Sequence, residues 1–239
     1  MQYDAVLSPR QDSLRRIVLF GTPVVLILLE LGHPLLDHMN PIKMLAPIAL
    51  WWIVLHVLLI PLFALMGYSL FLLLQGVQSK AATISRVATV VFVAFEVGYD
   101  TAVGLNSGIL VYNATTLPTA QQSVVQQALQ QLYGNPAIVV SYYVFFVAGI
   151  IALCSAAWAL SQVGVSRLPV IILLGTLIST YSHALPYGPI GTTCFLIAVL
   201  WIELVWRKSL SREDLREAIA SATHKHEDLV ANVSGGEQS

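Results

Sequence analysis

The sequence predicts an all-α, polytopic membrane protein: a six-transmembrane-helix bundle with an outer interfacial helix and a short cytoplasmic C-terminal helix. Of the 239 residues, 56% are hydrophobic and only 10% are charged, whereas an ordinary soluble domain is about 25% charged. The mean hydropathy is +0.75. The apolar residues form long runs, most of them near the roughly 20 residues that a helix needs to cross a bilayer.

The expected spans follow one another with short polar connections. They cover residues 17–37, 44–75, 86–112, 136–163, 168–185 and 190–206. The second run contains Pro61 and is longer than one crossing requires, so a tilted, bent or projecting helix is expected. The third run ends with Gly104 and Gly108, whose spacing lets a neighbouring helix approach closely.

One transmembrane domain, residues 17–207, is expected between two polar ends. Residues 1–16 form a cytoplasmic N-terminal segment, and residues 208–239 form a charged cytoplasmic tail in which Ser211 would cap a short helix. Residues 113–135 carry no charge, and a helix is expected there from a cap at Thr119 to about Tyr133. It would lie flat on the outer interface, the commoner arrangement, or cover a cavity as a lid.

Basic residues near the span ends are divided unequally between the two sides. One side holds Arg10, Arg15, Arg16, Lys80, Arg86, Arg167, Arg207, Lys208 and Arg212, and the other holds only Lys43. The positive-inside rule therefore predicts an integral, multi-pass membrane protein with both termini in the cytoplasm. An even number of spans leads to the same arrangement. The net charge of -1 argues against a nucleic-acid partner.

Ionisable residues from four different spans are expected at similar depth in the outer half of the bundle. A rise of about 1.5 Å per residue from the cytoplasmic ends places Glu30 and His33 at roughly 20 and 24 Å. Asp100 and His183 then lie at roughly 21 and 24 Å, and His56 at roughly 28 Å. This convergence predicts one shared site.

The end of the first span gathers two carboxylates and two imidazoles. Glu30, His33 and Asp37 have the spacing i, i+3, i+7, which a helix continuing to Asp37 would place on one face. The alternatives are simpler. A lone membrane histidine is usually a hydrogen-bond partner between helices, and Asp37 and His38 would also fit as solvated residues at a helix end.

The charges inside the spans are unbalanced, because Glu30, Glu96 and Asp100 have no lysine or arginine near them. A buried carboxylate is costly unless it is protonated, paired or bound to a cation. These three residues are therefore the candidate catalytic groups. The candidate metal ligands are His33, His56, His183 and Asp37, and the candidate substrate-binding residues are Tyr181, Asn106 and Trp52.

Several chemistries fit this residue set. A divalent zinc or iron ion is the first, although only half of a di-iron pattern is present, at Glu30-x-x-His33. Metal-free acid–base chemistry on a lipid or isoprenoid-like molecule is the second. Haem is disfavoured because few histidines lie at the depth required. The alternative class is a proton- or cation-coupled transporter, or a ligand-binding membrane protein. Membrane lipid and a hydrophobic small molecule are the expected partners.

Overall fold

The computed structural model describes residues 9–35 and 37–207, and every regular element in these residues is a helix. The all-α prediction is therefore confirmed. The chain divides into two compact units, Met1–Val199 and Leu200–Ser239, and the site described below lies wholly in the first. The helix expected from Ser211 lies outside the described residues.

Four helices in the described residues are long and apolar enough to cross a membrane, as expected of a membrane protein. They are Pro41–Leu73, Lys80–Ala114, Pro136–Gln162 and Tyr187–Trp206. The expected fifth span is shorter, because it is broken around Gly175 into α9 (Arg167–Leu174) and α10 (Leu177–Tyr181). The N-terminal helix is not among the four either, so the count of six spans stays a prediction.

The first helix ends earlier than the sequence suggested. It consists of α1 (Pro9–Arg16), the π-helical η1 (Ile17–Gly21) and α2 (Thr22–Glu30). Beyond Glu30 the chain turns, and His33 and Asp37 are not helical. The expectation that Glu30, His33 and Asp37 share one helical face is therefore wrong. Pro34 explains this, because a proline disfavours helical backbone at the residue before it and donates no hydrogen bond.

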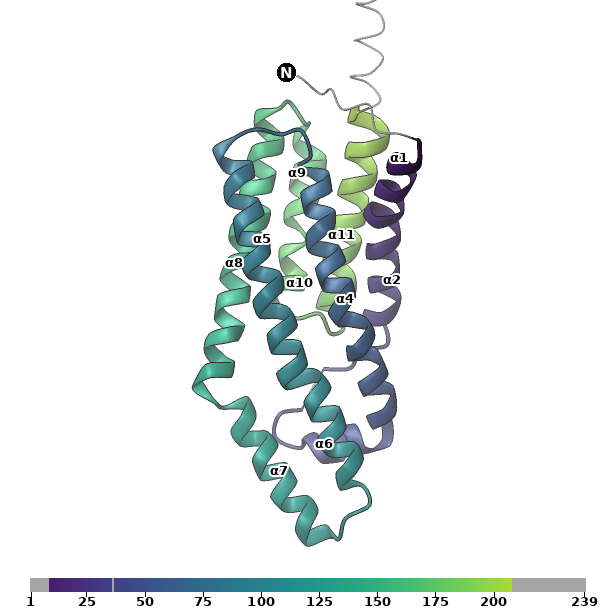
Figure 1. Ribbon diagram of the computed structural model, residues 1–239, viewed down its shortest axis with the longest axis vertical. Helices are drawn as coiled ribbons and strands as arrows, with labels where there is room; N and C mark the ends of the chain where they lie inside the picture. Colours follow the sequence, from purple (N-terminus) through teal and green to yellow (C-terminus); the bar gives the residue numbers. More distant parts are fainter. Residues whose placement is uncertain (1–8, 36, 208–239) are drawn as a thin grey trace, which may run out of the picture. The chain divides into compact units, whose positions relative to one another are not determined.

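The two longest helical segments carry most of the site. The first comprises α3 (Pro41–Leu45), η2 (Ala46–Ile48) and α4 (Ala49–Leu73), with Pro61 inside α4. The second comprises α5 (Lys80–Tyr99), the π-helical η3 (Asp100–Leu105) and α6 (Asn106–Ala114). They run side by side (Figure 1), and a Cβ at Gly108 would lie 2.7 Å from the Trp52 side chain. The small residue at this position therefore permits the close approach that its spacing predicts.

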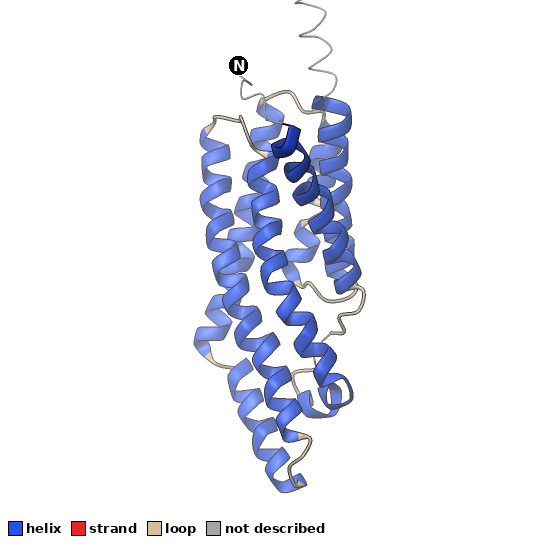
Figure 2. Cartoon of the chain, turned by 45° about the vertical axis from the view of Figure 1, so that its right-hand side comes forward, coloured by secondary structure: helices blue, strands red, loops and turns tan. Residues whose placement is uncertain are grey.

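The helix expected in residues 113–135 is present as α7 (Thr119–Tyr133), although its N-cap is Pro118 rather than Thr119. Its fully buried Leu129 packs with Leu45, Ala49 and Trp52. Figures 1 and 2 show α7 running back alongside α6. Its placement at a membrane interface stays a prediction.

The remaining helices are α8 (Pro136–Gln162), α9, α10 and α11 (Tyr187–Trp201), followed by the π-helical η4 (Ile202–Trp206) of the second unit. Helix α8 packs along α5, where the Ser85 hydroxyl donates to the carbonyl oxygen of Ala152 over 2.8 Å. The loop between α10 and α11 carries His183, which is partly buried.

The packing of α7 can be tested at Leu129. Leu129→Ala is expected to destabilise the protein by about 2–4 kcal/mol, because it leaves a void in a well-packed cluster. The measurement is the midpoint of thermal unfolding in a fixed detergent. Val124→Ala is the matched control, since Val124 on the same helix is 63% exposed and should change stability by no more than about 0.5 kcal/mol. Equal effects of the two substitutions would contradict this packing.

Candidate metal centre

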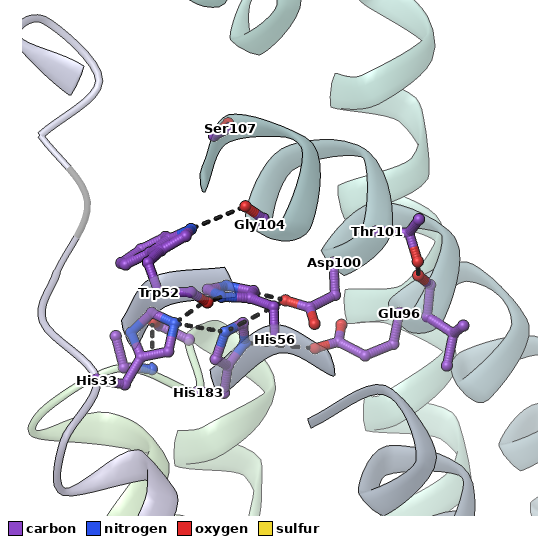
Figure 3. A network of polar contacts seen from close by, with 12 residues as sticks. His33, Trp52, His56, Glu96, Asp100, Thr101, Gly104, Ser107 and His183 are labelled. Atoms are coloured by element: carbon purple, nitrogen blue, oxygen red, sulfur yellow. Dashed lines mark hydrogen bonds and ion pairs between the residues drawn. The ribbon is translucent and has the colours of Figure 1, made fainter. Parts of the chain in front are cut away.

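Three histidines from distant parts of the chain meet inside the first unit (Figure 3). His33 follows α2, His56 lies on α4, and His183 lies between α10 and α11. Each offers one ring nitrogen, and the three nitrogens all lie within 4.8 Å of one another. His33 and His56 are 3% and 1% exposed, so water contributes little to their solvation.

Backbone contacts fix the proton positions of two of these rings. Nδ1 of His33 lies 2.8 Å from the carbonyl oxygen of Pro34, and Nδ1 of His56 lies 2.7 Å from that of Trp52. A carbonyl oxygen only accepts, so each Nδ1 must carry the proton and donate it. In the neutral imidazole the other nitrogen, Nε2, then has a free lone pair. The two Nε2 atoms face each other at 3.4 Å.

His183 completes the group from the opposite side. Its Nε2 lies 3.2 Å from Nε2 of His33, and its Nδ1 lies 3.5 Å from Oε1 of Glu96. A carboxylate at Nδ1 is the usual partner of a metal-binding histidine, because it fixes the tautomer and leaves Nε2 for the ion. With Nδ1 protonated in this way, a neutral His183 would present its Nε2 lone pair toward His33 and His56.

Asp100 brings a carboxyl oxygen to the same group. Its Oδ1 lies 3.5 Å from Nε2 of His56 and 3.6 Å from Nε2 of His183. Asp100 is 1% exposed, and its Oδ2 has no hydrogen-bond partner among the described residues. Figure 3 shows the Asp100 and Glu96 carboxylates approaching the histidines from one side.

Two of the three separations agree with a tetrahedral ion. Zinc–nitrogen bonds of about 2.0–2.1 Å place neighbouring ligand nitrogens about 3.3 Å apart. The His33–His56 and His33–His183 separations are 3.4 and 3.2 Å, and all three nitrogens lie within 4.8 Å of one another. The spacing of His33 to each of the other two imidazoles therefore already matches that of ligands around one ion.

The surrounding chain holds the rings in place. The indole of Trp52 packs against His56 and His33 in a tilted arrangement, with ring centroids 4.5 and 4.8 Å away. Its Nε1 donates to the carbonyl oxygen of Gly104 over 2.8 Å. The backbone N–H of Leu185 donates to the carbonyl oxygen of His33 over 3.2 Å, which ties the two histidine-bearing loops together.

The π-helical turn η3 sets the position of Asp100 against α4. A Cβ at Gly104 would overlap Cδ2 of the His56 ring and lie 3.0 Å from Oδ1 of Asp100. Glycine is therefore required for the imidazole and the carboxylate to share this space. Single π-helical turns occur frequently at functional sites.

A cavity of about 700 Å³ opens from the centre. The three histidines, Glu96 and Asp100 form its polar wall, and the rest is mainly aliphatic and aromatic. This volume lies in the usual range for small-molecule pockets, about 300–1,000 Å³. Tyr181 and Trp52, expected to bind substrate, both line it.

A second, smaller cavity of about 70 Å³ lies on the other side of His183 and Glu96, which line both spaces. Glu30 lines only the smaller one, together with Thr192 and Thr176. Glu30 is 2% exposed, and its Oε2 has no partner among the described residues. The structure thus brings Glu30 close to His183 but not into the large cavity.

Two residues expected at the site lie elsewhere. Asp37 is exposed on the loop after α2, outside the histidine group, and hydrogen bonds from the Asn40 side chain and the Met39 N–H lower the pKa of its carboxyl. Asn106 is exposed and does not line the cavity. Its neighbour Ser107 is buried instead and accepts a hydrogen bond from the Tyr133 hydroxyl over 2.9 Å.

Two residues support the imidazoles in a way that was not expected from the sequence. Gly104 was noted only for helix packing, and Trp52 only as a substrate contact. To predict that Gly104 and Trp52 support the imidazoles, one must know which faces of α4 and η3 meet. The small-residue spacing that ends with Gly108 was the one sequence signal that pointed to that contact.

Comparison of the chain with protein-family models, with characterised proteins and with solved structures finds no match. The chemistry of the site must therefore be argued from its own geometry.

The close contact between η3 and His56 can be tested at Gly104. Gly104→Ala should cost about 1–3 kcal/mol of stability, because the new methyl group would displace a buried, hydrogen-bonded ring. Gly98→Ala is the matched control: a Cβ there meets nothing within 4 Å, and alanine favours helix by up to about 1 kcal/mol. Thermal unfolding of the two variants measures the difference, and a Gly104→Ala protein as stable as the control would contradict the contact.

Proposed function

We propose that the protein is a membrane metalloenzyme. His33, His56 and His183 bind one divalent zinc or iron ion, and the adjoining cavity binds a hydrophobic small molecule on which the ion acts. The observation that carries this proposal is the convergence of three imidazole Nε2 atoms, two of which are fixed as lone-pair donors by backbone carbonyls.

Asp100 fits as a fourth ligand or as the partner of a metal-bound water. Its Oδ1 is near two of the three Nε2 atoms. A divalent ion would also balance the charges of Asp100 and Glu96, which have no lysine or arginine beside them in the described cavity lining. The centre thus supplies the compensation that buried carboxylates require.

A zinc or iron ion in such a site activates water or polarises a substrate carbonyl. Other residues of the chain orient the ligands and are placed to exchange protons. Glu96 orients His183 through Nδ1, and Trp52 covers the rings of His33 and His56. Glu30, behind His183, is positioned to exchange a proton with that side of the centre.

Transport of the ion is the second candidate, favoured by one observation. His183 and Glu96 line both cavities, so the centre has space on two sides. Proteoliposomes loaded with a zinc-sensitive dye distinguish the two functions. An enzyme should keep its ion and leave the dye unchanged, whereas a transporter should deliver zinc to the interior.

The metal content of purified protein tests the proposal directly. Elemental analysis is expected to find about one zinc or iron ion per chain, and His56→Ala or His183→Ala should weaken binding by at least about 100-fold, because each removes a direct ligand. His38→Ala is the control, since His38 is a histidine outside the group. Protein that stays metal-free after incubation with either ion would contradict the proposal.

The role of Glu96 predicts a smaller effect. Glu96→Gln keeps the shape of the side chain but removes the charge that faces Nδ1 of His183. Metal affinity should fall by about 10–100-fold, the usual range for a residue that orients a ligand. Competition with a chelator of known affinity measures this change. An unaltered affinity would show that Glu96 does not support the ligand, and Asp37→Asn serves as the control for a carboxylate outside the group.

A further inference from the structure

The described lining of the large cavity contains acidic side chains but no lysine or arginine. The only basic side chains in this described lining are histidines. Three of these are the proposed ligands, which bind metal as neutral imidazoles. The fourth, His38, packs edge-on against Tyr133 with ring centroids 4.9 Å apart, and partial desolvation lowers the pKa of its ring, which disfavours the cation.

The cavity does contain acidic side chains. Glu96 and Asp100 lie at the floor of the cavity beside the histidines, and both have an oxygen without a hydrogen-bond partner among the described residues. The proposed divalent ion would offset these two charges and leave no positive excess. A carboxylate or phosphate group entering here would lose its hydration and meet no lysine or arginine in the described lining to compensate its own charge.

The apolar part of the cavity reaches the surface. Several of its large apolar lining residues are substantially exposed: Leu35, Met39, Val139, Tyr143 and Tyr181. In a membrane protein such an opening admits molecules that are themselves apolar. The volume of about 700 Å³ holds on the order of twenty water-sized groups, enough for a single-chain lipid.

We propose that the substrate is an uncharged amphiphile, with one apolar chain along the aliphatic and aromatic wall and a neutral oxygen- or nitrogen-containing head, such as an amide, ester or alcohol, at the histidine group. This inference rests on the proposed function for the place of the reacting head, while the selection against anions follows from the cavity lining alone. Fatty-acid anions and phosphate-bearing lipids are excluded.

Three probes with one alkyl chain test the selection. Dodecanamide, dodecanoate and dodecyl phosphate are radiolabelled, and each is equilibrated with the full chain in phosphatidylcholine nanodiscs. Empty nanodiscs give the background for each probe. Dodecanamide should bind at least about tenfold more tightly than either anion, because only the anions carry a charge that no lysine or arginine of the described lining compensates.

A pair of lysine substitutions on α7 gives a matched control. The side chains of Gln130 and Gln126 both donate to the carbonyl oxygen of Met39, over 2.6 and 3.4 Å, but only Gln130 lines the cavity. Gln130→Lys should raise the affinity for dodecanoate about tenfold relative to dodecanamide, by placing a cation in the lining. Gln126→Lys should leave the ratio unchanged.

Anion binding as tight as dodecanamide binding in the unaltered protein would overturn the inference, as would equal effects of the two lysines. Elemental analysis of the same samples separates this result from the fate of the metal. A preference for dodecanamide in metal-free protein would overturn the metal proposal and still support the neutral substrate. A preference for anions in metal-loaded protein would do the reverse.

Discussion

The contact between Nε2 of His33 and Nε2 of His56 constrains the rest of this structure. Both nitrogens are acceptors, because the opposite nitrogen of each ring donates to a backbone carbonyl. Two buried lone pairs 3.4 Å apart repel each other unless a proton or a cation lies between them. A proton could serve only one such contact, whereas His183 and Asp100 approach the same point. The metal ion proposed above would compensate the three imidazoles and Asp100 together.

The sequence predicted which residues lie near this centre, but not how their side chains are arranged. Counting the helical rise from the expected membrane surfaces brought His33, His56, Asp100 and His183 to one layer, and the structure places them together. The count succeeds because the helix rise is nearly constant, at about 1.5 Å per residue, so an error of one residue in a helix end shifts the expected depth by only that amount. It cannot say which way a side chain points around its helix.

The differences have physical causes at particular residues. The helix was extended past Glu30 on the strength of spacing, but Pro34 favours extended backbone at His33. His33 therefore joins the histidine group from a loop, and Asp37 is exposed to solvent. Glu30, still helical, projects to the opposite side of His183 and lines the smaller cavity. Likewise the fifth span was judged by its apolar length, which does not reveal the break between α9 and α10 around Gly175.

The scaffold shows why such a centre needs local departures from regular helix. A regular α-helix offers residues four apart on one face, as for Glu96 and Asp100, but it also places a side chain at every position. At Gly104 there is none, and the His56 ring occupies that space, with the indole of Trp52 hydrogen-bonded to the same residue's carbonyl oxygen. The π-helical turn and the glycine thus give up helical regularity and side-chain packing where the imidazole and carboxylate must meet. Sequences break such local rules mainly where a site requires it, and here the break falls at the centre itself.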